Sequence, residues 1–363
     1  MPIFMDRHDV AETITAEMIA QIHQEDLKIQ DQYGCRGLTY WFDEKRNTAF
    51  CLVEAPDAAA IHKMHDQAHG QVATRIIEVN ADVVEAFLGR IEDPEKAPEA
   101  ELNIIDDPAL RIIMIVSLKQ LKPTKHISAH LKTSLDHFNY STIDIINTLK
   151  GNLVKQTENY FLVSFKSATD AFNAALKIQL LFKDLKRDIS DEQVMLKIGL
   201  SAGLPVTQKK SFFEEPVKLA EWMCKIIKGE IIVSSEVREL YNSENLNPLG
   251  GGEAVFFLTE TEEKFLTSLM DYAEDNWINT DLKIDDFSKA LGCSISQLYR
   301  KMTSLTGKSA NTFITEYRLN EALNLLNKNA GNISEIAFQT GFSSPSYFSK
   351  CFKKKYGRLP YEY

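Results

Sequence analysis

Histidines are concentrated near the start of this 363-residue chain, where five of the eight lie in the first seventy residues. His62, His65 and His69 are spaced i, i+3 and i+7, which places them on one face of a helix. His65 and His69, one turn apart, can chelate a single metal ion. The spacing therefore predicts a metal site on this helix.

Other ligands are available in the same segment: His8, His23, Cys35 and Cys51. Imidazole combined with thiolate suits nickel, copper or zinc, and does not suit magnesium or calcium. An alternative stays open at this point, in which the histidines are solvated and the cysteines are small buried hydrophobic residues.

The C-terminal part carries a second kind of chemistry. Leu282–Ser294 combines a short apolar-faced helix, a glycine turn and an N-cap serine, and a helix at Ser296–Leu305 follows. Its expected inner face is formed by Leu298, Met302 and Leu305. This layout is typical of a helix-turn-helix, in which the outer face of the second helix meets DNA.

The same layout occurs again at Ile333–Phe342, which leads into a helix at Pro345–Lys353. Pro345 suits the first helical turn, and either Ser343 or Ser344 suits the cap. A helix at Asn311–Asn327 separates the two motifs. Two such motifs in tandem predict a DNA-binding unit, whereas a single one would also fit an ordinary helical hairpin.

Charge is distributed unevenly along the chain. The net charge is −10, yet Ser294–Tyr363 contains ten Lys and Arg against four acidic residues. One basic module on an acidic body is the footprint expected of nucleic-acid binding, although charge alone also fits a solvated basic surface.

The composition, with 44% hydrophobic and 25% charged residues, is that of a globular protein of two or three domains. No apolar run approaches the roughly 18 residues that a membrane span needs. The first residues show no basic region followed by an apolar stretch, and the five cysteines are scattered. We therefore expect a cytoplasmic protein with no membrane partner.

The chain divides into four expected segments: 1–90, a linker at 91–108, 109–260, and 261–363. The breaks are the charged, proline-bearing Ile91–Pro98 and the Asn-, Ser- and Gly-rich Asn242–Gly252. We expect a multidomain α+β protein with two βαββαβ modules followed by an all-α tandem helix-turn-helix domain.

Periodicity supports this division. In the first segment it predicts strands at Ile3–Arg7, Leu38–Phe42, Thr48–Val53 and Arg75–Val79, and helices at Ala16–Gln32 and Ala58–His69, the latter capped by Asp57. In the middle segment it predicts strands at Arg111–Val116, within Gly151–Phe165, and at Leu196–Gly203, Glu230–Ser234 and Ala254–Leu258, and helices at Ile127–His137 and Ala168–Phe182. The remainder, from Glu262, is predicted to be helical.

The C-terminal hundred residues resemble the AraC/XylS family, through Leu298–Lys301, Arg318–Ala322, Ile336-Ala337, Gly341-Phe342 and Phe352–Pro360. The resemblance implies double-stranded DNA as partner, with both second helices in successive major grooves. The residues it implicates in DNA binding are Ser296, Tyr299, Arg300, Lys301, Ser344, Ser346, Ser349, Lys350, Lys353 and Lys354. Lys353, Lys354 and Lys355 are expected to neutralise phosphates. Tyr299 could instead pack against a neighbouring helix, and Ala337, Phe342, Phe348 and Phe352 are expected in the core.

Residues Ile112–Leu258 resemble class III nucleotide cyclases, through Val154–Phe165, Leu196–Gly203 and Gly229–Ser234. The resemblance implies two metal-binding carboxylates, and Ser117 and Asn159 occupy the matching positions. The supporting Asn and Arg are replaced by Lys218 and Trp222. Because two carboxylates must hold the catalytic metal ions, we expect no catalytic residues, no enzymatic activity and a pseudo-cyclase scaffold.

Residues 1–90 resemble small nickel-binding ferredoxin-like proteins, through Phe4–His8, Phe50–Asp57 and His65–His69. The resemblance favours nickel as the metal. We therefore expect a homodimeric DNA-binding transcriptional regulator that responds to a metal or a small ligand. A nucleotide cyclase or a metal store, fused to a DNA-binding module, is the alternative.

Overall fold

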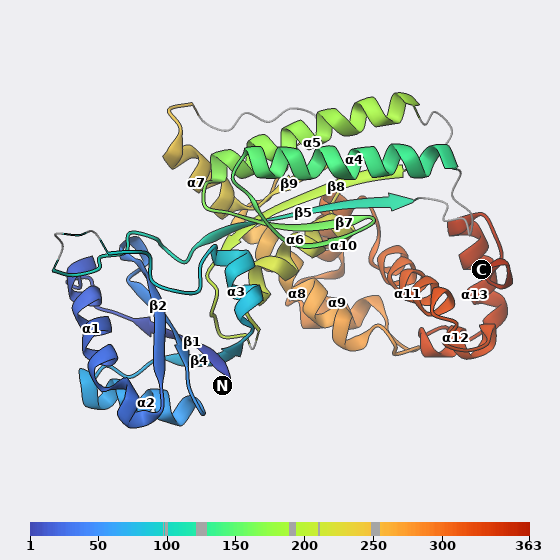
Figure 1. The fold of residues 1–363 in the computed structure, drawn as a ribbon. Helices are drawn as coiled ribbons and strands as arrows, with labels where there is room; N and C mark the ends of the chain where they lie inside the picture. The colour runs from blue at the N-terminus through green and yellow to red at the C-terminus, as the bar shows by residue number, and fades with distance from the viewer. Residues whose placement is uncertain (97, 99–100, 121–128, 189–193, 210, 248–254) are drawn as a thin grey trace.

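The computed structural model describes residues 1–96, 98, 101–120, 129–188, 194–209, 211–247 and 255–363. Two parts of the chain are each built on a β-sheet, and a helical part follows at the C-terminus (Figure 1). Within the described residues, no helix is long and apolar enough to cross a membrane.

The first part is a four-stranded antiparallel sheet with the order β2-β3-β1-β4. Its elements are β1 (Ile3–Asp9), α1 (Ala16–Ile29), a 3-10 turn at Gln30–Tyr33, β2 (Arg36–Asp43), a 3-10 turn at Glu44–Arg46, β3 (Thr48–Glu54), α2 (Ala58–Ala68), β4 (Arg75–Val79) and α3 (Ala81–Leu88). The predicted βαββαβ order is therefore confirmed. Asp57 caps α2 as predicted, since its carboxylate accepts a hydrogen bond from Ala60 N.

This sheet is covered on both faces, so neighbouring residues of β3 enter different cores. Phe50 and Leu52 belong to a core shared with the middle part of the chain. Cys51 and Val53 belong to a core beneath α1 and α2. This alternation places polar side chains of the same sheet under the two helices.

The middle part repeats the same strand order and extends it. Its elements are β5 (Arg111–Gln120), α4 (Ala129–Thr148), β6 (Asn152–Thr157), β7 (Tyr160–Phe165), α5 (Ala168–Asp188), β8 (Val194–Gly203), α6 (Glu214–Ile226), β9 (Ile231–Val233), α7 (Ser235–Glu244) and β10 (Val255–Phe257). The sheet order is β10-β9-β8-β5-β7-β6. The predicted βαββαβ module is confirmed as its inner part, and β9 and β10 are added in parallel beside β8.

Several elements differ from the sequence prediction. Helices α3, α6 and α7 were not predicted. Helix α6 lacks a side-chain cap, because the residue before it is Phe213 in a left-handed conformation (φ 53°). The predicted helix at Ile127–His137 begins at two residues outside the described ones, and α4 extends well beyond its predicted end. The predicted break Asn242–Gly252 includes the end of α7, and its residues 248–252 lie outside the described part, as does Ala254 of the predicted last strand.

Helix α3 joins the first two parts. Phe87 stacks on Phe213 with ring centroids 4.7 Å apart. The buried guanidinium of Arg111 donates hydrogen bonds to Phe87 O (3.2 Å) and Leu88 O (2.9 Å) at the end of α3. These bonds satisfy carbonyls that a helix end leaves without partners, so the two sheets are held together by apolar and polar contacts.

The segment predicted as a linker, 91–108, is irregular and its described part packs on the first sheet. The hydroxyl of Tyr40 donates to Asn103 O (2.8 Å) and accepts from Ile105 N (2.9 Å). Ile105 itself is buried in the core beneath α1 and α2.

The C-terminal part contains α8 (Glu260–Asn276), α9 (Ile284–Ala290), α10 (Ile295–Thr306), α11 (Ala310–Asn327), α12 (Ile333–Gln339), α13 (Pro345–Tyr356) and a 3-10 turn at Pro360–Glu362. Ser294 caps α10 as predicted, and Ser344, one of the two predicted candidates, caps α13. The residues predicted for the cores of the two motifs are buried: Leu298, Met302, Leu305, Ala337, Phe342, Phe348 and Phe352. Two helix-turn-helix motifs therefore flank α11.

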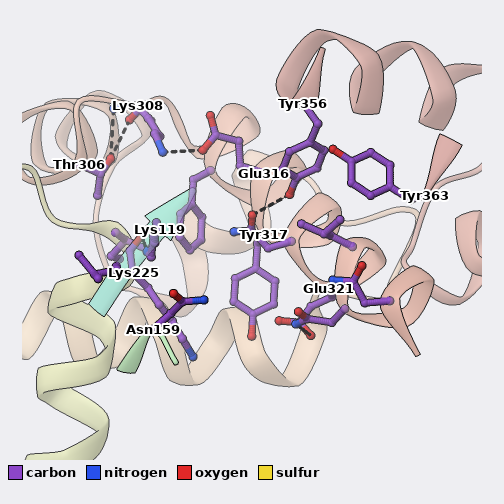
Figure 2. A pocket seen from close by; sticks show the side chains of 17 residues that line it. Lys119, Asn159, Lys225, Thr306, Lys308, Glu316, Tyr317, Glu321, Tyr356 and Tyr363 are labelled. Carbon is purple, nitrogen blue, oxygen red and sulfur yellow. Dashed lines mark hydrogen bonds and ion pairs between the residues drawn. The ribbon is translucent and has the colours of Figure 1, made fainter. Parts of the chain in front are cut away.

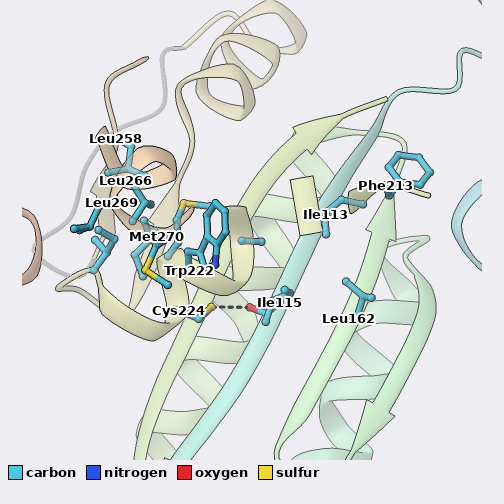
Figure 3. Close-up of a cluster of buried hydrophobic side chains, with 14 of the residues drawn as sticks. Ile113, Ile115, Leu162, Phe213, Trp222, Cys224, Leu258, Leu266, Leu269 and Met270 are labelled. Carbon is cyan, nitrogen blue, oxygen red and sulfur yellow. Dashed lines mark hydrogen bonds between the residues drawn. The ribbon is translucent and has the colours of Figure 1, made fainter. Parts of the chain in front are cut away.

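Helix α8 packs against α6 of the middle part. Leu266, Leu269 and Met270 lie in one core with Trp222 (Figure 3). The indole nitrogen of Trp222 donates to Glu274 Oε1 (2.8 Å), and Lys228 N donates to Leu305 O (3.0 Å). The helical part is thus docked on the middle part by a continuous core.

The turns of the two motifs make a matched test of packing. Gly341 and Gly292 both have a positive φ, of 77° and 58°. A Cβ at Gly341 would lie 2.7 Å from Trp277 O, whereas one at Gly292 would meet nothing within 4 Å. We expect Gly292→Ala to cost roughly 1–2 kcal/mol for the left-handed backbone. Gly341→Ala should cost about 1–3 kcal/mol more, because the neighbouring backbone must move.

Urea unfolding of both variants measures the difference in the free energy of unfolding. Equal losses in the two variants would contradict the packing described for the second turn.

Candidate metal centre and nucleic-acid interface

A buried group of carboxylates and imidazoles lies between the first sheet and its two helices. Asp6 comes from β1, Asp26 from α1 and His65 from α2. His65 Nε2 lies 2.7 Å from Asp6 Oδ2, and its Nδ1 lies 3.0 Å from Asp26 Oδ1. All three residues are almost completely buried. The imidazole therefore bridges two carboxylates that come from different elements.

Charge complementarity fixes this arrangement. Burial opposes the charge on His65, yet its hydrogen bonds to Asp26 and Asp6 raise its pKa to about 10. Burial likewise opposes the charge on Asp6, and the nearby His8 and His65 hold its pKa well below its usual range. The pKa of Asp26 is lowered in the same way by His65 and His69. One protonated imidazole thus supplies the positive charge that two buried carboxylates require.

Two sets of three potential ligands meet at this bridge. One set is Asp26, His65 and His69, and the other is Asp6, His8 and Cys51; in each, the ligand atoms lie within 4.8 Å of one another.

The two outer histidines face the carboxylates. His69 Nε2 lies 3.2 Å from Asp26 Oδ1, and His8 Nε2 lies 3.4 Å from Asp6 Oδ1 in a poor geometry for a hydrogen bond. The space between the two sets is a cavity of about 20 Å³, enough for one water-sized ion.

Cys51 is held at the bridge by its backbone and by burial. Its N–H donates to Asp6 Oδ1 (2.9 Å), which fixes that carboxylate from the sheet side. Burial, together with the charges of Asp6 and Asp26, raises the pKa of its thiol well above the usual value. The thiol is therefore protonated at neutral pH, and only a bound cation at the site would favour the thiolate.

The structure brings together four of the seven residues predicted as metal ligands: His8, Cys51, His65 and His69. Of the others, His23 lines the same cavity but pairs with Asp93 Oδ2 (3.2 Å). The structure places His62 and Cys35 in neither set of ligands, and Cys35 is buried in the core with its Sγ 3.7 Å from Tyr33 O.

Sequence reasoning missed both carboxylates of the bridge. Asp6 follows the alternation of β1, and Asp26 is buried on the inner face of α1. The available signal was an aspartate on the same expected inner face as a histidine, Asp6 with His8 on β1 and Asp26 with His23 on α1, because a buried charge is usually paired.

The second candidate surface is formed by α10 and α13. The residues predicted to contact DNA that are exposed on these helices are Ser296, Tyr299, Arg300, Lys301, Ser346, Lys350, Lys353 and Lys354. Ser344 and Ser349 are partly exposed. Tyr299, for which packing was the alternative, is 56% exposed.

Two side chains on these helices are already engaged within the protein. The hydroxyl of Ser344 accepts a hydrogen bond from Tyr347 N as the cap of α13. Lys355, expected to neutralise a phosphate, instead donates to Glu316 O (2.9 Å) and to Asn320 Oδ1. Lys355 therefore joins α13 to α11.

The positions compared with the nucleotide cyclases make structural contacts, two through the backbone and two through side chains. Ser117 pairs with Tyr160 across β5 and β7, and Asn159 O accepts from Leu118 N (2.9 Å). Lys218 forms an ion pair with Glu214 (3.1 Å), and Trp222 is buried against α8. The cyclase resemblance of the middle part stays a prediction.

Comparisons with known proteins match both ends of the chain. Residues 4–79 match the family described as nickel responsive protein SCO4226-like. Residues 287–363 match the family described as helix-turn-helix domain. The crystal structure of SCO4226 from Streptomyces coelicolor A3(2) is 35% identical, covers 21% of this chain and 94% of that chain, and gives a TM-score of 0.21.

Two relatives are similar over part of the chain. Histidine kinase P4 of Formosa agariphila is 41% identical over 106 residues, which are 29% of this chain and 8% of that protein. The HTH-type transcriptional regulator MtrA of Neisseria gonorrhoeae is 33% identical over 98 residues, 27% of this chain and 31% of that protein. The chain thus spans less than a third of either relative. The two family matches thus cover the first sheet and the C-terminal helix-turn-helix motifs, which are similar to a nickel responsive protein family and to a helix-turn-helix family found in transcriptional regulators.

Proposed function

We propose that this protein is a sequence-specific DNA-binding transcriptional regulator whose first domain binds a transition metal ion, with nickel favoured. The observation that carries the proposal is the pair of helix-turn-helix motifs whose second helices, α10 and α13, expose polar and basic faces. The regulator relatives support it. We further propose that the protein acts in the cytoplasm as a homodimer on double-stranded DNA, since paired modules can read repeated half-sites.

The chemistry of the exposed side chains suggests separate tasks. Arg300 and Lys350 are suited to donate hydrogen bonds to guanine O6 and N7 in the major groove. Ser296, Tyr299, Ser346 and Ser349 are suited to less selective base or sugar contacts. Lys301, Lys353 and Lys354 are suited to phosphates, which add affinity without sequence information.

The metal proposal rests on the donor set around the Asp6–His65–Asp26 bridge. Two carboxylates, three imidazoles and one thiol converge there. Such mixed nitrogen, oxygen and sulfur ligands suit nickel, copper and zinc. A divalent cation would also supply the positive charge that protonated His65 supplies in its absence. The match to nickel responsive proteins favours nickel among the three.

We infer that the middle domain is a scaffold and not a cyclase. Trp222, at a position compared with a catalytic residue of that family, is used to dock α8 through Glu274. An assay for cyclic nucleotide from ATP or GTP with manganese tests this inference, and product above background would contradict it.

Nickel binding tests the metal centre. In His65→Ala we expect nickel affinity to fall by more than about 100-fold, beyond the range of outer-shell partners, because the imidazole between the two carboxylates is lost. His62→Ala, on the same helix but in neither ligand set, is the matched control and should keep wild-type affinity.

Isothermal titration of the metal-free full chain measures both values. A wild-type affinity in His65→Ala, or an equal loss in His62→Ala, would contradict the proposed ligand set.

DNA titrations test the two tasks at the interface. Arg300→Ala should weaken binding to the specific site by about 1–3 kcal/mol and relax the preference at one base pair. Lys353→Ala should weaken binding to all sequences alike and reduce the salt slope by about 1. Lys177, exposed on α5, gives a control substitution, Lys177→Ala, with no expected effect.

Fluorescence anisotropy with a specific and a scrambled duplex, at several salt concentrations, separates these outcomes. Equal loss on both duplexes in Arg300→Ala would show that Arg300 does not read a base.

A further inference from the structure

A cavity of about 580 Å³ lies between the middle domain and the helix-turn-helix domain. From the middle domain it is lined by Lys119 of β5, Asn159 of the β6–β7 turn and Lys225 of α6. From the other side α11 contributes most of the lining, including Asn324. Tyr317 and Glu321 of the same helix are labelled in Figure 2. Its volume is typical of small-molecule sites, and none of its lining residues belongs to the metal centre or is among those proposed to contact DNA.

Ammonium groups are crowded around this cavity. Lys119 Nζ donates to two backbone carbonyls, Cys224 O (3.0 Å) and Lys225 O (3.5 Å). Burial, and then the neighbouring Lys197, Lys225 and Lys308, lowers the pKa of Lys119 to about 8 against the opposing effect of Cys224. The protein therefore holds a costly positive charge at the wall of an open cavity.

Lys355 of α13 adds a further positive charge beside the cavity. Its Nζ donates to Glu316 O and Asn320 Oδ1, which belong to residues of the cavity wall. Burial, together with the charges of Lys308 and Lys119, lowers its pKa to about 8 against the opposing effect of Glu316. The charge of Lys119 in the middle domain thus lowers the pKa of Lys355 on α13.

The carboxylates at the cavity offset the charge of these ammonium groups only in part, through Glu316 near Lys355. Glu316 forms an ion pair with Lys308 (2.5 Å), and Glu321 lies 3.4 Å from Asn324 Nδ2. Among the ion pairs of the described residues, none joins a carboxylate to Lys119 or Lys355. An anion with two negative charges would supply what both ammonium groups lack.

The remaining lining suits the body of an organic molecule. Phe313 and Tyr317 lie on α11 with ring centroids 6.2 Å apart, and Asn324 and Asn327 follow on the same helix. Aromatic faces and amide groups along one helix can contact a ring or a sugar.

We propose that this interdomain cavity binds a small organic phosphate, with the phosphate group near Lys119 and the organic body along α11. Such a ligand touches both domains, so it favours their docked arrangement. Because α11 joins the two helix-turn-helix motifs, the ligand would act on DNA binding from a site separate from the metal centre. This inference does not depend on nickel binding.

Isothermal titration of the full chain tests the site with AMP, ATP, glucose 6-phosphate and inorganic phosphate, and with adenosine and glucose as partners that lack the phosphate. We expect at least one organic phosphate to bind saturably with a Kd of about 1 mM or tighter. Its phosphate-free partner and inorganic phosphate should bind at least about tenfold more weakly. No saturable binding, or equal affinity for inorganic phosphate, would overturn the proposal.

Three variants locate the site. Lys119→Met should weaken the binding by about tenfold or more through loss of one charge. Asn324→Asp, on the exposed side of α11, should weaken it similarly by placing a negative charge at the cavity without disturbing the core. Lys177→Met, on α5, should bind like wild type. Unchanged binding in both Lys119→Met and Asn324→Asp would place the ligand elsewhere and refute the site.

Discussion

Two buried carboxylates in the first domain require a positive charge between them, and the metal binding that we propose follows from that need. Asp6 and Asp26 are brought together by β1 and α1, and His65 of α2 lies between them. Leaving a buried charge without its partner costs about 3–5 kcal/mol. The centre therefore holds either a proton on His65 or, as we propose, a metal ion in its place.

This exchange gives metal binding a structural consequence. The two ligand sets together include residues of β1, β3, α1 and α2, so a cation that drew on both sets would join all four elements. The same sheet contacts the middle domain through its other face and through α3. A change in the spacing of these elements would therefore alter the contact between the first sheet, with α3, and the middle domain.

The second interdomain contact joins the middle domain to the helix-turn-helix motifs that we propose bind DNA. Trp222 and its neighbours on α6 share a core with α8. The backbone N–H of Lys228 donates a hydrogen bond to Leu305 O near the end of α10. Contiguous packing of this kind can carry coupling between sites. If metal changes the affinity for DNA, DNA must change the affinity for metal by the same factor.

Much of the fold could be predicted because its signals are local. Helix ends are marked within a few residues by cap side chains, such as Ser294 and Asp57, and by the turn glycines. The pair His65 and His69 is equally local, since these residues are one helical turn apart. The two aspartates of the metal centre could not be assigned from spacing, since Asp6 and Asp26 meet His65 only through tertiary packing. Similarly, α6 begins without a cap signal.

The roles of residues that act through contacts between domains also could not be predicted from the sequence. Lys355 lies in a basic run typical of phosphate contacts, yet α11 provides it with partners. Trp222 gives no sign along the chain that it meets Glu274.

The most direct test of the account is the affinity of the full chain for DNA from upstream of its own gene, measured with and without nickel. We predict selective binding whose Kd nickel shifts, and we predict that this shift disappears in His65→Ala/His69→Ala while DNA binding itself remains. Selective binding that is indifferent to nickel would contradict metal sensing by the first domain. Absence of selective binding in both conditions would contradict the central claim that this protein is a DNA-binding regulator.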